Sequence, residues 1–94
     1  MKMTPEMAET IALQALVWIL EDDDMAQRFL GLSGADPQAL RQGADSPEVL
    51  CSVMDFVLMA DQTVLAFSGA LNLPPDTVAA ARYSLPGGEQ VHWT

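Results

Sequence analysis

The chain has little cysteine and histidine, and this shortage excludes several kinds of chemistry. Cys51 is the only cysteine among 94 residues, so no intrachain disulfide forms and a cytoplasmic location is expected. His92 is the only histidine, and metal clusters and nucleophile–base pairs both need several convergent groups. We therefore predict that the protein is not an enzyme and uses no metal or cofactor.

Basic residues are also scarce. Four Lys and Arg stand against 13 Asp and Glu, which gives a formal net charge of −9. Phosphate backbones and anionic membranes both attract clustered cations, and the four cations here are scattered along the chain. This composition disfavours nucleic acid and favours a protein partner with a basic surface. A simpler explanation is that the acidity keeps a small apolar domain soluble.

No hydrophobic run is long enough to cross a bilayer comfortably. Residues 11–20 are apolar apart from Gln14, but a transmembrane helix needs about 20 such residues. The first residues also do not show a clear form of the basic start and the small-residue cleavage site that mark a signal peptide. We therefore expect no membrane association.

The sequence does contain a strongly apolar helix near its middle, at about residues 47–60. Ser46 is a good N-cap and Pro47 a good first helical residue. Its apolar side chains recur at helical spacing and extend to both flanks: Val49, Leu50, Cys51, Val53, Met54, Phe56, Val57, Leu58 and Met59. A helix that is apolar nearly all round is normally enclosed by other elements. The prediction is an all-α protein in which residues 1–88 form a single compact domain around this helix.

Caps and stop residues delimit the remaining helices, for a total of five or six. Thr4 opens the first helix, the acidic run 21–24 caps the second, and Asp61 is expected to cap the fifth. Gly31 and Gly34 stop the second helix, and Asn72 is a plausible left-handed stop for the fifth. The expected ranges are 5–20, 24–32, 37–42, 62–71 and 75–84. The first helix should bury Met7, Ile11, Leu13, Leu16, Val17, Ile19 and Leu20.

A faint internal similarity emerges when the chain is compared with itself at the offset that aligns position 18 with position 56. The matched pairs are Trp18 and Phe56, Asp23 and Asp61, Phe29 and Phe67, Gly34 and Asn72, Pro37 and Pro75, and Leu40 and Val78. Two copies that share one core would form a pseudo-symmetric domain. The alternative is coincidence, because helical proteins commonly share such cap and stop residues.

The candidate partner contacts lie at the C-terminal tail and at the acidic corner. Trp93 stands in the tail, 89–94, where a large aromatic side chain must dock either on the domain or on a partner. Tyr83 and Arg82 precede that tail and extend the expected surface. Asp22 and Asp23 represent the acidic corner between the first two helices.

A DNA-associated regulator is the alternative function. The segment 29–42 resembles a helix-turn-helix hairpin, with Gln38, Arg41 and Gln42 as candidate base contacts. Its second helix is short and carries a single Arg, so an ordinary helical hairpin explains the same pattern. An enzyme or a small-ligand carrier with a pocket among the helices comes third.

Four segments resemble a known family over nearly the whole chain. They are ETIALQALVWIL (9–20), RFLGLSG (28–34), LNLPP (71–75) and LPGG (85–88). Together they are similar to a family of short alphaproteobacterial proteins, the domain of unknown function 3572 family. The resemblance implies a cytoplasmic bacterial protein with a helical fold, and it carries over no activity and no site residue. We therefore expect a noncatalytic interaction or regulatory module that is a monomer or a weak homodimer.

Overall fold

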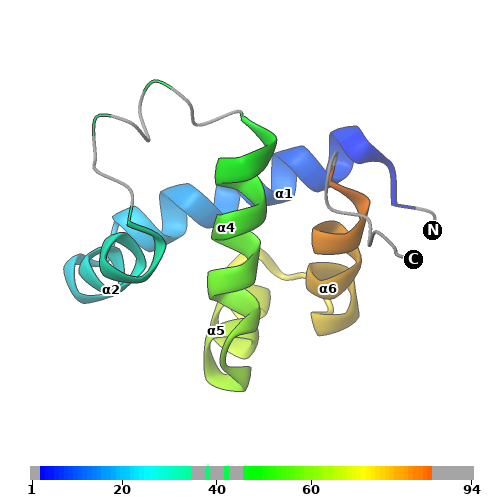
Figure 1. The fold of residues 1–94 in the computed structure, drawn as a ribbon. Helices are drawn as coiled ribbons and strands as arrows, with labels where there is room; N and C mark the ends of the chain where they lie inside the picture. The colour runs from blue at the N-terminus through cyan, green and yellow to red at the C-terminus, as the bar shows by residue number, and fades with distance from the viewer. Residues whose placement is uncertain (1–2, 35–37, 39–41, 43–45, 86–94) are drawn as a thin grey trace.

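The computed structural model describes residues 3–34, 38, 42 and 46–85, and within them every regular element is an α-helix. Figure 1 shows the five helices that have defined bounds: α1 (Pro5–Leu20), α2 (Asp23–Ser33), α4 (Pro47–Leu58), α5 (Asp61–Leu71) and α6 (Pro75–Ser84). The predicted all-α class and the single compact domain are confirmed. Most of the expected helix at 37–42 and the whole tail, 89–94, lie outside the described residues.

Helix α4 is the centre of the fold, as its apolar pattern predicts. It packs against α1, α2, α5 and α6, and Figure 1 shows it crossing in front of α1. Leu50, Val53 and Met54 are buried in the core. The Ser46 hydroxyl accepts a hydrogen bond from the backbone N–H of Val49 at 3.2 Å, which confirms the expected N-cap. Met59 was expected in the core, but it follows the last residue of α4 and is 63% exposed.

Most of the expected caps are present. Thr4 Oγ1 accepts from the N–H of Met7 at 3.1 Å, and Asp22 Oδ1 accepts from the N–H of Met25 at 3.0 Å. The prediction for Asp61 is wrong, because Ala60 is the N-cap of α5 and makes no side-chain bond. Asp61 is instead the first helical residue, where a carboxylate is favourable to the helix dipole.

Two residues in the left-handed conformation end α2 and α5. Gly34 has a φ of 73° and Asn72 a φ of 57°, and both occupy the C-cap. The expected stop at Gly31 is wrong, because α2 continues through it to Ser33. Helices tolerate an internal glycine at a modest cost in stability, so composition alone does not locate the stop.

The internal offset seen in the sequence is a real structural correspondence within the described part of the chain. Under this offset the first and last residues of α2 correspond to the first and last residues of α5. The left-handed C-cap residue Gly34 likewise corresponds to Asn72. The ring contacts are reciprocal: Trp18 lies 5.3 Å from Phe67, and Phe29 lies 5.5 Å from Phe56. Because Trp18 corresponds to Phe56 and Phe67 corresponds to Phe29, the two ring contacts are equivalent under the offset. Reciprocal contacts of this kind are expected where two equivalent units pack against each other. The expected matches at 37 and 40 lie outside the described residues.

Candidate functional groove between α1 and α5

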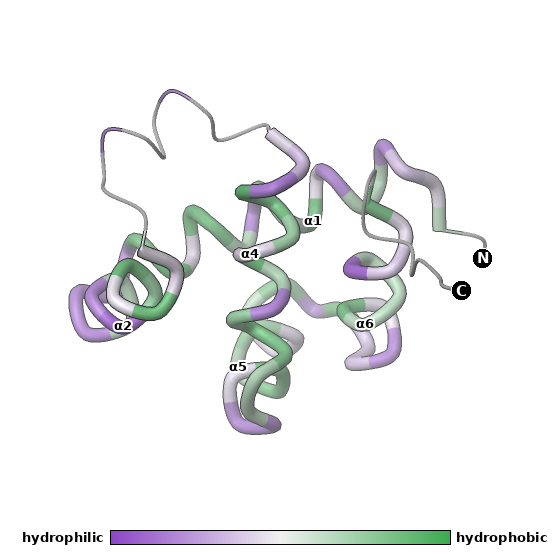
Figure 2. The backbone as a smooth tube through the Cα atoms, in the orientation of Figure 1, coloured by the Kyte–Doolittle hydropathy of each residue, from purple (hydrophilic) through white to green (hydrophobic). Residues whose placement is uncertain are grey.

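One apolar side of α1 is not covered by the other helices. Val17 is 57% exposed, Leu20 44% and Leu13 37%, so the prediction that these three side chains are buried is wrong. The opposite side of α1 fills the core with Ala8, Ile11, Ala12, Ala15, Leu16 and Ile19. Figure 2 shows hydrophobic residues distributed along α1. A helix that is apolar on several sides can bury only the side that its neighbours contact, and α4 and α6 contact one side of α1.

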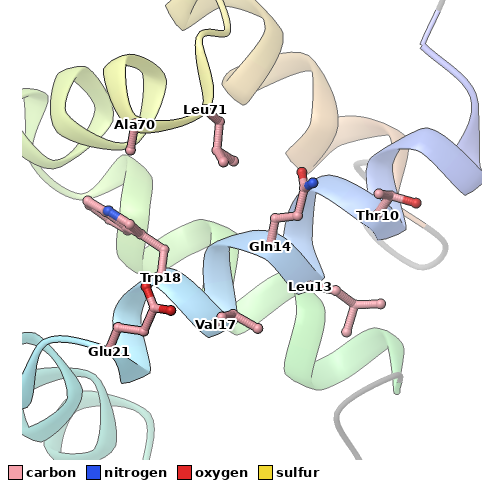
Figure 3. A pocket seen from close by; sticks show the side chains of 8 residues that line it. All are labelled: Thr10, Leu13, Gln14, Val17, Trp18, Glu21, Ala70 and Leu71. Carbon is pink, nitrogen blue, oxygen red and sulfur yellow. The ribbon is translucent and has the colours of Figure 1, made fainter.

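The uncovered side forms one wall of a groove, which we name the α1–α5 groove. Its volume is about 500 Å³, and Figure 3 shows its lining: Thr10, Leu13, Gln14, Val17 and Trp18 from α1, Glu21 at the C-cap of α1, and Ala70 and Leu71 from α5. The α1 residues follow the spacing i, i+3, i+4, i+7, i+8 and i+11, which places them in one stripe along the helix. The groove is therefore a continuous feature about three helical turns long.

Packing on α5 fixes the aromatic part of this wall. The indole of Trp18 meets the buried ring of Phe67 at an interplanar angle of 51°, a tilted aromatic contact. Trp18 remains partly exposed on its groove side. Leu71 and Ala70 stand opposite at the end of α5, just before the chain turns at Asn72. The groove thus has an ordered apolar floor.

The charges around the groove are negative. Of the described residues that line it, Glu21 alone is charged. Glu21 continues into the exposed run Asp22–Asp24, in which Asp22 also caps α2. At the other end Glu6 is exposed one turn before Thr10, on the same stripe. An apolar centre with acidic ends is therefore the chemical character of this surface.

A second groove, between α2 and α4, is the counterpart of the first under the internal offset. It is lined by Phe29, Leu32, Ser33, Ser52, Asp55, Phe56 and Met59 and has a volume of about 160 Å³. Except for Phe29, each residue of this lining is the counterpart of a residue that lines the α1–α5 groove. The corresponding residues of the α1–α5 groove are Gln14, Val17, Trp18, Glu21, Ala70 and Leu71.

The two grooves differ at their middle. Asp55 stands where the first groove has Val17, and its carboxylate accepts a hydrogen bond from the guanidinium of Arg82 at 2.6 Å. The charged Asp55 therefore lines the α2–α4 groove, whereas the equivalent residue of the α1–α5 groove is apolar. Of these two grooves, only the α1–α5 groove offers a continuous apolar surface to a partner.

The predicted partner contacts that the structure describes lie on two different helices. Tyr83 is 65% exposed on α6, while Asp22 and Asp23 lie at the start of α2. The side chain of Arg82 is engaged by Asp55, and this hydrogen bond raises the pKa of Arg82 against the opposing effect of partial burial. Trp93 lies outside the described residues.

The candidate DNA contacts are only partly described. Gln38 and Gln42 are exposed, and Arg41 lies outside the described residues. Sequence reasoning missed Leu13, Val17, Trp18 and Leu71 as site residues. The available signal was that residues 11–20 hold more apolar side chains than one helix face can bury.

Metal and membrane sites are the remaining possibilities among the described residues. There, no group of three His, Cys, Asp or Glu side chains is placed to hold a metal ion. No single described helix has the length and apolar character needed to cross a membrane. Helices α4 and α5 reach that length only as a pair, which bends by 108° at their junction.

These features define a small all-α domain with an exposed apolar groove. Residues 5–88 match the family model described as protein of unknown function (DUF3572), so the chain belongs to that family. The expected resemblance is thereby confirmed. No curated protein and no solved structure matches the chain.

Proposed function

We propose that the protein is a noncatalytic, cytoplasmic interaction module that binds a partner protein through the α1–α5 groove. The observation that carries this proposal is the exposure of Val17 and Leu13, which line the groove, on an otherwise well-packed helix. Contiguous apolar surface of this kind marks interaction sites in soluble proteins. Trp18 supports it further, because a tryptophan anchored on one face and open on the other is a frequent centre of binding energy.

The groove chemistry favours binding over catalysis. Thr10 and Glu21 supply its hydroxyl and its carboxylate, and at the rise of an α-helix these two positions are about 16 Å apart. General acid–base or nucleophilic catalysis requires such groups within hydrogen-bonding reach of the same reacting atoms. The lining therefore supports recognition of an apolar surface.

The shape of the groove also favours a protein over a small molecule. Small-molecule pockets bury most of the surface of their ligand. Here Val17 is more than half exposed and the lining follows one side of α1, so the groove is open along its length. An elongated element of a partner fits such a surface better than a compact ligand.

The proposal is tested by capture from an extract of the protein's own cells, with two charge-matched variants. Val17→Lys places a cation in the middle of the groove. Leu65→Lys places the same charge on α5 at a residue that is 61% exposed and does not line the groove. We expect wild type and Leu65→Lys to retain the same partner protein, and Val17→Lys to lose it. Calorimetry with the purified partner should reproduce this order.

Two results would overturn the proposal. One is that Val17→Lys retains every captured protein as well as wild type does. The other is that no protein is recovered reproducibly by wild type. Circular dichroism of both variants checks that each is folded before the comparison is made.

A further inference from the structure

Resting on the proposed function, we infer that the occupant of the α1–α5 groove is an amphipathic α-helix of the partner. This helix is about three turns long, apolar along one face, and carries Lys or Arg at its ends. The inference follows from the length of the groove, the mainly apolar character of its lining and its charge.

The length follows from the stripe on α1. From Thr10 to Glu21 the stripe spans about 16 Å at the rise of an α-helix. A partner helix of three turns has the same length and presents apolar side chains at i, i+3 or i+4, and i+7 along one face. These positions match the Leu13, Val17 and Trp18 part of the lining.

The apolar lining favours a helix over an extended peptide. An extended segment leaves backbone N–H and C=O groups to be satisfied, and an exposed sheet edge normally does so. The described elements are all helices. Leu13, Val17, Trp18, Ala70 and Leu71 offer aliphatic or aromatic surface to the backbone of an occupant. Only a helix satisfies its own backbone before it is placed on such a floor.

The charges specify basic ends. Glu21 and the exposed Asp23 and Asp24 lie at one end of the groove, and Glu6 lies at the other. The carbonyl end of α5, at Leu71, adds the negative pole of a helix dipole beside the lining. With a net charge of −9 the whole chain attracts cations over long range. A partner helix with an apolar middle and cationic ends is therefore complementary.

The same charges argue against a second copy of this chain as the occupant. In a two-fold dimer through this groove identical patches meet, and the two α1 helices run either antiparallel or parallel. The antiparallel arrangement places the Glu6 end against the Glu21 end of the other protomer, and the parallel one places each acidic end against its own copy. Like charges juxtaposed in an interface oppose association.

The test is a selection from a phage-displayed library of random peptides, each long enough to form at least three helical turns, against the full chain. Phage that also bind Val17→Lys are removed. We expect apolar residues at helical spacing and Lys or Arg near both peptide ends. The peptides should gain helical circular dichroism on binding. Replacing their terminal Lys or Arg by Glu should weaken binding at least about tenfold, because attraction becomes repulsion.

The counterpart groove supplies the matched control. Met59 lies at the position equivalent to Glu21 and is 63% exposed, so Met59→Lys adds the same charge as Val17→Lys outside the α1–α5 groove. We expect Met59→Lys to bind the selected peptides within about twofold of wild type. Val17→Lys should weaken them at least about tenfold, since an apolar contact is lost and a charge is buried.

Several outcomes would overturn the inference. These are selected peptides that are acidic, that lack helical spacing, that stay extended when bound, or that lose more affinity with Met59→Lys than with Val17→Lys. A dimer in sedimentation equilibrium that Val17→Lys dissociates would show a second copy as the occupant. Tighter peptide binding by Trp93→Ala would show that the chain's own C-terminal segment occupies the groove.

The two proposals fail separately. A Val17-dependent cellular partner combined with acidic or extended selected peptides would reject only the helical, basic occupant. Absence of a Val17-dependent cellular partner would reject the proposed function, whatever peptides the library yields.

Discussion

Arg82 on α6 donates two hydrogen bonds to Asp55 on α4, from Nε to Oδ1 at 2.6 Å and from Nη2 to Oδ2 at 3.4 Å. The side chain of Arg82 is 21% exposed and that of Asp55 is 60% exposed. This two-point contact joins the last described helix to the central one. Asp55 also lines the α2–α4 groove, at the position whose equivalent in the α1–α5 groove is the apolar Val17.

The Arg82–Asp55 pair should contribute modestly to stability. In a double-mutant cycle of Arg82→Ala and Asp55→Ala, we expect a coupling of about 0.5–1 kcal/mol, because half-exposed ion pairs are screened by water. Urea unfolding of the four proteins measures it, and salt at about 1 M should reduce it. A coupling that is absent, or that is unchanged by salt, would contradict a stabilising ion pair.

The contribution of Arg82 should not vary with pH near neutrality. Its pKa is raised in the folded protein by the hydrogen bond with Asp55. The stabilisation is therefore complete below the pKa of the unfolded state, and it is lost only as the pH rises through the folded-state value in strong alkali. The loss of stability caused by Arg82→Ala should be equal at about pH 6 and 9, since the guanidinium stays charged throughout. Urea unfolding at both pH values measures it, and a clear difference between them would contradict this account.

Leu50 should be among the most costly residues to truncate. It is 1% exposed on α4, and Leu50→Ala should lower the free energy of unfolding by about 2–5 kcal/mol through lost burial and a residual cavity. Leu65→Ala, at a residue that is 61% exposed on α5, should change it by less than about 0.5 kcal/mol. Equal effects in urea unfolding would show that the core is not centred on α4.

Removing one buried hydroxyl should stabilise the protein. Ser68 on α5 is 5% exposed, and its Oγ has no hydrogen-bond partner among the described residues. Ser68→Ala should raise the free energy of unfolding by about 1 kcal/mol, because an unsatisfied hydroxyl is no longer desolvated.

Ser52 is the matched control, since it is exposed in the interior of α4. Ser52→Ala gains only helix propensity and should add less than about 0.5 kcal/mol. A Ser68→Ala variant that is less stable than wild type in thermal unfolding would show that the hydroxyl is satisfied.

Gly31 and Gly34 should respond to alanine in opposite directions. A Cβ on either residue meets nothing within 4 Å, so backbone conformation decides the result. Gly31 is inside α2, and Gly31→Ala should stabilise by up to about 1 kcal/mol. Gly34 has a φ of 73°, and Gly34→Ala should destabilise by about 1 kcal/mol. Changes of the same sign in urea unfolding would contradict this assignment of the two glycines.

Local chemistry made much of the fold predictable from the sequence. Thr4 and Ser46 each satisfy a backbone N–H at a helix start, and Asn72 tolerates the left-handed conformation, whatever lies around them. The internal similarity was also detectable, because Phe29 and Phe67 recur at equivalent helix positions. The amino-acid pattern alone determined most of the helices, most of their ends and the enclosed position of α4.

The α1–α5 groove was decided only by tertiary packing. Apolar residues surround α1 on several sides, and periodicity does not say which of them the neighbouring helices cover. Ala12 and Ala15 are fully buried in the core, whereas Val17 on the same helix is 57% exposed and lines the groove. Burial is a property of how helices are arranged around one another, so the sequence determined that α1 is apolar and the three-dimensional structure determined which apolar side is free to bind.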